Sequence, residues 1–218
     1  MGSFLLPKKI SSGEHVPSEP YLAYYDHEEC YVNLSGRYDY LETSYYASQD
    51  LECTGRNVHP TCKEILDAYV TPLFLEKAKL SGLAVPEYYI TNGFFEPPVI
   101  IDTMNPFMVR SSIVLKAGHK NRVAKSMTRN YTYAICCQEL PLTAQVKYFR
   151  LVLGWSNSRR FREIADSVWK VFHIPLARIR VIILESGEML LSNVEHLPFE
   201  RLNAKELAYL QEKVTWEE

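Results

Sequence analysis

The stretch from Tyr31 to Tyr46, YVNLSGRYDYLETSYY, carries five tyrosines in sixteen residues. A buried strand would favour Val and Ile, and a solvated loop would not carry so many aromatic rings. The composition of Cys30–Leu34 predicts a short strand, and the polar Ser35–Arg37 segment predicts a turn. Residues at helical spacing follow, at Leu41, Tyr45, Ser48 and Leu51. The stretch therefore predicts a strand, a tight turn and a helix, with tyrosines gathered at the corner.

The overall composition is that of an ordinary globular protein. The chain has 218 residues, of which 47% are hydrophobic and 23% are charged, and this length suits one large domain or two small ones. The longest apolar runs are too short to span a bilayer, and the N-terminal order of apolar residues and lysines is the reverse of a signal peptide. Five scattered cysteines do not indicate a disulfide framework. We expect a reduced, cytoplasmic protein that does not associate with membranes.

The rest of the chain predicts both helices and strands. Helical patterns occur at 61–69, 71–82 and 158–172, and Asn203 with Glu206 forms an Asn-led capping box for a last helix. Short β-rich runs separated by turn residues favour strands and loops over 85–140, and a hairpin is expected around Ser186-Gly187. We predict an α+β fold: a single domain over residues 30–218 with a mixed sheet, a strand–helix–strand unit and about five helices. Residues 1–29 are expected to form an extended N-terminal arm.

The charge distribution is uneven. No Asp or Glu occurs from Thr103 to Gln138, and removing the six Lys and Arg of this stretch takes the net charge of the remaining chain from −2 to −8. Such a segment can attract a phosphate, a carboxylate or a nucleic acid. The alternative is that these residues are solvated and paired with acids from elsewhere in the chain. The segment holds Arg110, Lys116, His119, Lys120, Arg122, Lys125 and Arg129.

Motifs for self-contained catalysis are missing from the sequence. Cys53, His59 and Cys62 lie close together, but their spacing matches no paired zinc motif. Cys136 and Cys137 are adjacent, so on a strand they would point to opposite faces and could not act as a dithiol. No nucleophile elbow, phosphate-binding loop or dinucleotide fingerprint occurs. We therefore assign no catalytic residue and no metal ligand.

Two blocks of sequence resemble the N-terminal domain of RimK-like ATP-grasp proteins. The first is VNLSGRYDYLETSYYASQDLECTGRNVHP, and the second is KYFRLVLGWSNSRRFREIADSVWKVFHIPLARIRV; together they cover about a third of the chain. The matching features of the first block are Asn33-Leu34, Tyr38, Tyr40, Tyr45-Tyr46, Gly55 and Pro60. Those of the second are Gly154, Arg160-Phe161-Arg162 and Pro175-Leu176. The sequence departs from the family pattern at Arg37, which lies one residue later than expected, and at Ser44, which replaces a Gly.

The resemblance implies a role beside an enzyme. Such domains usually precede a RimK-like ATP-grasp ligase, which joins carboxylates to amines through acyl phosphates. ATP and magnesium would belong to that associated ligase, and no cofactor is expected in this chain. The segments IVLKAG and GEMLLSNVEHLPF are also similar to ATP-grasp elements, with Lys116 on a strand and Glu188, Glu195 and Asn193 near a magnesium ion. A plain hairpin with exposed acids is the favoured interpretation, because a glycine-rich loop and an acidic hinge are missing.

These observations lead to a binding hypothesis. The corner would place five residues around a helix N-terminus, where the helix dipole favours anions: Asn33, Arg37, Tyr38, Tyr45 and Tyr46. Tyr31 and Tyr40 are expected to pack between helix and sheet instead. Together with the basic stretch, the corner would hold a peptide, an amino acid or another carboxylate, or dock the ligase domain or subunit. One alternative is an RNA- or tRNA-binding module that stacks bases on Tyr131 and Tyr133; another is a small divergent ATP-dependent ligase.

Overall fold

The computed structural model describes residues 21–40, 42–104 and 109–216. They form helices and several sheets, which confirms the α+β class. Where the sequence predicted one domain, the contacts group the chain into two compact units. Among the described residues, the first unit combines those within 21–66, 150–178 and 196–216, and the second combines those within 67–149 and 179–195. Each unit is described by itself below.

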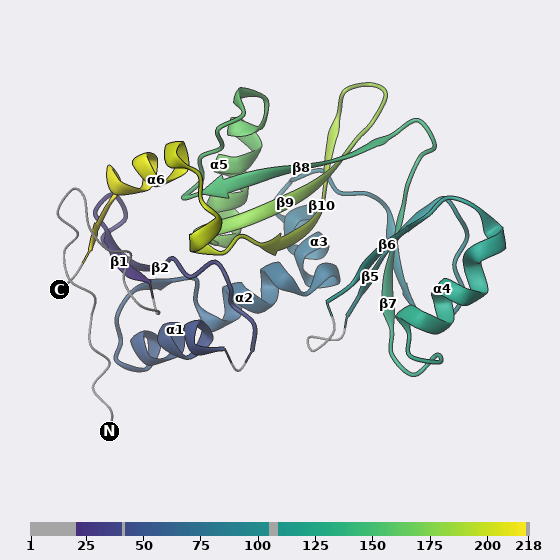
Figure 1. The fold of residues 1–218 in the computed structure, drawn as a ribbon, viewed down its shortest axis with the longest axis horizontal. Coiled ribbons are helices and arrows are strands. Elements are labelled where there is room, and N and C mark those ends of the chain that lie inside the picture. Colours follow the sequence, from purple (N-terminus) through teal and green to yellow (C-terminus); the bar gives the residue numbers. More distant parts are fainter. Residues whose placement is uncertain (1–20, 41, 105–108, 217–218) are drawn as a thin grey trace. The chain divides into compact units, whose positions relative to one another are not determined.

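The first unit contains a mixed sheet of order β11-β1-β2-β3 (Figure 1). Its strands are β11 (Val214–Trp216), β1 (Leu22–Tyr25), β2 (Cys30–Asn33) and β3 (Val58–His59). Strand β1 is antiparallel to both β11 and β2, whereas β3 is parallel to β2. The predicted strand at the tyrosine stretch is thus confirmed as β2. The segment expected to be an arm contributes β1 to the sheet, and its residues 1–20 lie outside the described residues.

The helices of the first unit follow the sequence pattern closely. Helix α1 (Thr43–Cys53) is the predicted helix after the tyrosine turn, and α5 (Arg162–Phe172) lies where the apolar periodicity placed it. Helix α2 (Cys62–Tyr69) also lies where it was predicted, and the boundary between the two units falls within it. A 3₁₀ helix, η2 (Arg159–Phe161), precedes α5, and a second one, η3 (Phe199–Arg201), precedes α6 (Ala204–Gln211). The predicted capping box of α6 is confirmed: Asn203 accepts hydrogen bonds from two backbone N–H groups, and Glu206 accepts one from the Asn203 backbone.

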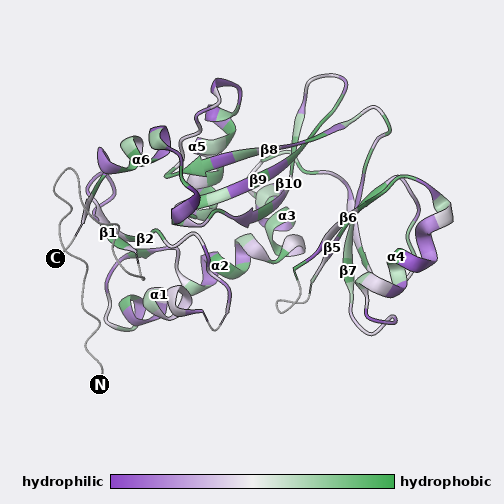
Figure 2. Ribbon diagram, viewed as in Figure 1, coloured by the Kyte–Doolittle hydropathy of each residue, from purple (hydrophilic) through white to green (hydrophobic). Residues whose placement is uncertain are grey.

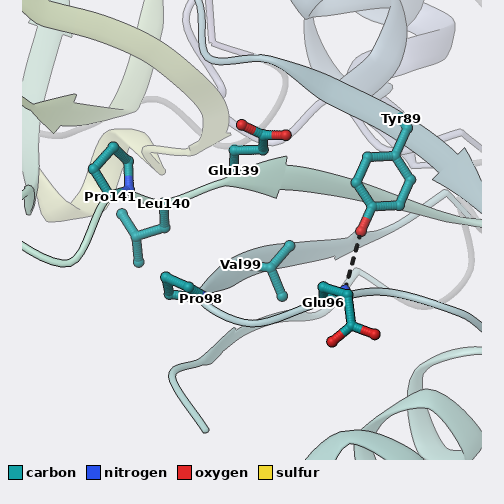
Figure 3. A pocket seen from close by; sticks show the side chains of 7 residues that line it. All are labelled: Tyr89, Glu96, Pro98, Val99, Glu139, Leu140 and Pro141. Atoms are coloured by element: carbon teal, nitrogen blue, oxygen red, sulfur yellow. Dashed lines mark hydrogen bonds between the residues drawn. The ribbon is translucent and has the colours of Figure 1, made fainter. Parts of the chain in front are cut away.

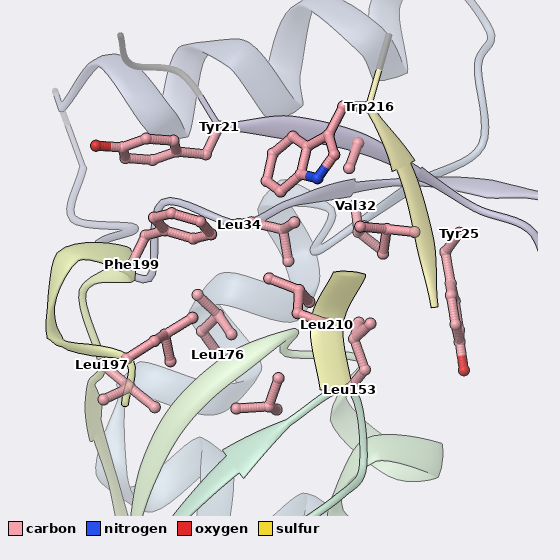
Figure 4. Packing of buried hydrophobic residues seen from close by; sticks show 14 of the residues in the cluster. Tyr21, Tyr25, Val32, Leu34, Leu153, Leu176, Leu197, Phe199, Leu210 and Trp216 are labelled. Carbon is pink, nitrogen blue, oxygen red and sulfur yellow. The ribbon is translucent and has the colours of Figure 1, made fainter. Parts of the chain in front are cut away.

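The core of the first unit is formed by residues of β1, β2 and β11 together with residues from 152–176 and 197–210. Figure 4 shows Val32 of β2 and Leu34, which follows this strand, facing Leu153, Leu176 and Leu210. At one side of this cluster the rings of Tyr21 and Phe199 stack with centroids 4.6 Å apart. Burial of these side chains, each contributing about 2 kcal/mol, stabilises the unit.

The second unit contains α3 (Thr71–Leu80) and a sheet of order β4-β7-β5-β6. Its strands are β4 (Tyr88–Thr91), β7 (Ile135–Glu139), β5 (Val99–Thr103) and β6 (Ser111–Val114), and neighbouring strands are antiparallel. This helix lies where the 71–82 pattern predicted it, with Val70 as its N-cap and Pro72 in its first turn. The four strands confirm the β-rich character expected for residues 85–140.

Helix α4 (Lys120–Met127), preceded by η1 (Ala117–His119), was not predicted. It covers one face of the four-stranded sheet (Figure 1), and its Ala124 and Met127 are buried among residues of β5 and β7. Figure 2 shows hydrophilic residues along much of this helix. Its contacts with the apolar cluster come from Val123, Ala124 and Met127. So short an apolar pattern in a polar run gives little periodicity to detect.

A third sheet has the order β10-β9-β8. Its strands are β8 (Gln145–Val152), β9 (Leu176–Ile183) and β10 (Met189–His196), and the boundaries of the two units fall within them. The order β8, α5, β9 along the chain is the predicted strand–helix–strand unit, and β9 and β10 are the arms of the predicted hairpin. Among the described residues, no helix has both the length and the apolar character needed to cross a bilayer.

Candidate functional site

The inner residues of the tyrosine corner hold the corner together. Asn33 is fully buried, and its Nδ2 donates to the Ser44 backbone oxygen (2.6 Å) and to Ser48 Oγ (3.1 Å). Tyr38 is also fully buried, and its hydroxyl donates to the Asn33 backbone oxygen at 2.7 Å. Burial raises the pKa of the Tyr38 phenol far above its usual range. This geometry favours a structural role for Asn33 and Tyr38 over ligand contact.

Among the outer residues of the corner, Tyr40 and Tyr46 are exposed and Tyr45 is half-buried. Tyr40, Tyr45 and Tyr46 form a row of edge-to-face rings, with centroids 5.5 and 5.9 Å apart. Arg37 is exposed beside them. The expected packing of Tyr40 between helix and sheet is wrong, since its ring is 54% exposed; Tyr31 does pack against buried apolar residues. Arg37, Tyr45 and Tyr46 therefore stay as the predicted binding residues of this corner.

The basic stretch runs from the residue before β6 to the loop after α4, within the second unit. Arg110 immediately precedes β6, Lys116 precedes η1 and His119 ends it. Three cations belong to α4, and Arg129 follows that helix; all seven side chains are exposed except the half-buried Lys120. His119 and Arg122 line a pocket of about 280 Å³ beside β6 and α4. The basic stretch and the tyrosine corner belong to different units, so each is a candidate surface of its own.

Pairing with acids neutralises little of this stretch. Lys120 forms an ion pair with Glu96 and lies over the Phe94 ring, 3.8 Å from its centroid. Within the described part of the chain, no ion pair involves the other five Lys and Arg residues of the stretch, which are Arg110, Lys116, Arg122, Lys125 and Arg129. Their positive charge is thus available to an anionic partner.

A buried polar network lies at the centre of the second unit. Asp102 of β5 and Arg180 of β9 form a two-pronged ion pair, with N–O distances of 3.0 and 2.5 Å. Gln138 Nε2 donates to Asp102 Oδ2 at 2.8 Å, and Arg180 Nε donates to Ser192 Oγ at 2.9 Å. The Ser192 hydroxyl in turn donates to Gln138 Oε1 at 2.7 Å. The charged groups therefore have several hydrogen-bond partners, as their burial demands.

The ion pair keeps the Arg180 guanidinium charged. Burial alone would lower the pKa of Arg180, but the adjacent Asp102 carboxylate outweighs it and raises that pKa. Neither residue was predicted from the sequence to belong to a site. The available signal was an Asp within the apolar run PPVIID and an Arg within ARIRVIIL, since unpaired charges are rarely buried in strands.

The residues compared with a magnesium–nucleotide site do not fit one. Lys116, expected on a strand, lies after β6 and is exposed. Asn193 uses its amide within the protein, donating to Asp102 Oδ1 (3.3 Å) and accepting from the Val194 backbone N–H (2.9 Å). Within the described ranges, neither Glu188 nor Glu195 belongs to a cluster of three potential metal ligands. We therefore assign no nucleotide chemistry to these side chains.

A second pocket of the second unit, of about 390 Å³, opens beside the start of β5 and the end of β7 (Figure 3). Glu96 and Glu139 place carboxylates at its rim, and the Tyr89 hydroxyl accepts a hydrogen bond from the Glu96 backbone N–H at 3.4 Å. Pro98, Val99, Leu140 and Pro141 form its apolar wall. The two carboxylates make this pocket unsuited to an anion, unlike the pocket beside α4.

A known protein family matches most of the chain. The family described as the RimK-like ATP-grasp N-terminal domain matches residues 20–213. The chain belongs to this family. The match covers both units, including the region 86–139 that the two sequence blocks left unassigned. No curated protein sequence matches the chain.

Solved structures with a similar fold are ATP-grasp proteins. A RimK-domain ATP-grasp protein from Sphaerobacter thermophilus is 12% identical, with a TM-score of 0.53 over 75% of this chain and 70% of that one. D-alanine–D-alanine ligase from Helicobacter pylori is 12% identical, with a TM-score of 0.55 over 76% and 66%. The ATP-grasp ligase PsnB is 15% identical, with a TM-score of 0.49 over 70% and 57%. At such low identity, the first two likenesses establish the fold alone, and this chain spans only part of each structure.

Proposed function

We propose that this RimK-like ATP-grasp N-terminal domain is a non-catalytic recognition or docking domain of a carboxylate–amine ligase. The Asp102–Arg180 network is the observation that carries the proposal. It fills the interior of an ATP-grasp-like fold with protein side chains that satisfy one another, and it engages Asn193, one of the residues expected near magnesium. A buried site built this way leaves few groups to bind a nucleotide.

The surface offered for recognition is the basic stretch. Its cations are exposed and mostly free of ion pairs within the described residues, and His119 and Arg122 line a pocket. Arg binds carboxylates with two parallel hydrogen bonds, and a cluster of cations steers an acidic partner during encounter. We propose that the partner is an acidic face of the ligase or a carboxylate-bearing peptide held for it. The exposed Arg37 and Tyr46, with the half-buried Tyr45, would form a second contact of the same kind.

Docking is tested with the RimK-like ATP-grasp ligase encoded in the same genome. We expect the 218-residue chain to bind this ligase, and a variant with four basic residues changed to serine to bind at least about tenfold more weakly near 0.1 M salt. The four changes are Lys116→Ser, Arg122→Ser, Lys125→Ser and Arg129→Ser. Biolayer interferometry with the ligase immobilised measures both dissociation constants.

A control variant carries the same loss of charge elsewhere, through Lys79→Ser, Arg159→Ser, Arg160→Ser and Lys205→Ser, all at exposed positions. We expect its affinity to stay within about threefold of the wild type, because long-range charge alone is screened within about 10 Å at this salt concentration. No binding by the wild type, or an equal loss in the control, would contradict docking through the basic stretch.

RNA binding is a second candidate, favoured by aromatic rings near the same cations. Tyr131 and Tyr133 follow α4 and are 47% and 42% exposed, and Phe94 is exposed beside Lys120. Exposed rings next to cations are the usual platform for unpaired bases. If four cations contact phosphates, log Kd for a single-stranded RNA is expected to rise with log salt with a slope of about 3. A filter-binding series from low to moderate salt measures this slope, and a flat response excludes the RNA function.

A further inference from the structure

Two histidines and a glutamate meet in the first unit, and one of the histidines, His173, is distant from the other two residues in sequence. His59 ends β3, Glu64 lies in the first turn of α2, and His173 directly follows α5. The Nδ1 atom of His59 is 2.9 Å from Glu64 Oε2, and Nδ1 of His173 is 2.9 Å from Glu64 Oε1. The two imidazole rings stack with their centroids 4.4 Å apart and their planes 19° from parallel.

Neighbouring groups hold the three side chains in place. The Thr61 backbone N–H donates to Glu64 Oε2 at 2.7 Å. Trp169 contacts both imidazoles edge-on, with ring centroids 6.1 Å from His59 and 5.7 Å from His173. Its indole N–H donates to Glu28 at 2.8 Å, which fixes the ring. Side-chain exposures of 15% for His59, 13% for Glu64 and 32% for His173 leave the cluster partly buried but reachable from solvent.

We propose that His59, Glu64 and His173 bind a divalent transition-metal ion, with zinc as the best candidate. Two imidazoles and one carboxylate are a common zinc ligand set, with the fourth position left to water. One donor atom from each residue lies within 4.8 Å of the others. Donor atoms around a tetrahedral zinc ion are separated by about 3.3 Å, and the two 2.9 Å contacts, one to each carboxylate oxygen of Glu64, are close to that separation.

A thiol lies close to the cluster but is a poorer donor. Cys30, His59 and Glu28 form a second group whose potential ligand atoms lie within 4.8 Å of one another. Cys30 is fully buried, whereas His59, Glu64 and His173 are reachable from solvent. The proposal therefore rests on the two imidazoles and the Glu64 carboxylate. It is independent of the docking function, which concerns the basic stretch of the second unit.

Zinc and cobalt binding to the 218-residue chain, stripped with a chelator and freed of any histidine tag, tests the site. We expect about one Zn²⁺ per chain by equilibrium dialysis, a micromolar or tighter dissociation constant at pH 7.5, and a Co²⁺ absorption spectrum typical of four-coordinate nitrogen and oxygen ligation. His59→Asn, Glu64→Gln and His173→Asn should each weaken zinc binding at least about tenfold. Asn suits position 173 because the backbone there has φ 49°, which Asn tolerates.

His196→Asn is the matched control. His196 belongs to the same unit and contacts one carboxylate, Asp39, at 3.1 Å, but no second imidazole is part of that contact. Its zinc affinity should equal that of the wild type. Less than about 0.2 zinc per wild-type chain, unchanged affinity in the three ligand variants, or equal loss in His196→Asn would overturn the proposal. Circular dichroism checks that each variant folds. If a variant does not fold, the zinc stoichiometry and the cobalt spectrum of the wild type test the proposal instead.

Discussion

Replacing Asp102 with alanine is expected to destabilise the second unit by about 3–5 kcal/mol, because it leaves the buried Arg180 guanidinium without its counter-ion. The carboxylate accepts hydrogen bonds from Arg180, Gln138 and Asn193, and each of these donors would lose a partner. Burial keeps water from replacing the lost contacts. Urea denaturation followed by circular dichroism measures the change in the free energy of unfolding.

Two further variants separate the ion pair from general effects of substitution. Arg178→Ala removes an exposed arginine two residues earlier in β9 and should cost less than about 1 kcal/mol. The double variant Asp102→Leu with Arg180→Met removes both charges and should recover much of the stability lost in Asp102→Ala. If Asp102→Ala unfolds within about 1 kcal/mol of the wild type, the network does not organise the unit as described.

Local signals allowed much of the fold to be predicted from the sequence. The capping box of Asn203 and Glu206 spans only three residues, so both partners are visible in one short segment. The apolar stripe of α5 repeats over three turns and locates that helix in the same way. Helix α4 escaped detection because it has eight residues and a mostly polar surface. Its stability comes from Ala124 and Met127 packing on the sheet, which a local pattern does not reveal.

The candidate sites depend on contacts between distant positions. Asp102 and Arg180 are 78 residues apart, and His173 meets a glutamate that follows α1 and β3 early in the chain. From the sequence, the possible partners of His59 were its neighbours Cys53 and Cys62. In the structure its partners are Glu64 and His173. The role of a tyrosine is also hard to predict from its position: Tyr38 and Tyr40 are two residues apart, yet Tyr38 is fully buried and Tyr40 is 54% exposed. Residue type alone does not separate a structural ring from a binding ring.

Replacing Gly36 with alanine should unfold the first unit, at a cost of more than about 4 kcal/mol. Gly36 lies in the turn of the tyrosine corner with φ +68°, and an added Cβ would lie 1.8 Å from the Leu197 backbone oxygen. The backbone at this point cannot move aside, because the Phe199 N–H donates to the Ser35 oxygen at 3.1 Å. Gly55→Ala is the control: its φ is +73°, but no atom lies within 4 Å of the added Cβ, so only backbone strain of about 1–2 kcal/mol is expected. Thermal and urea unfolding of both variants measure the difference, and similar stability of the two would show that Leu197 does not cross the turn so closely.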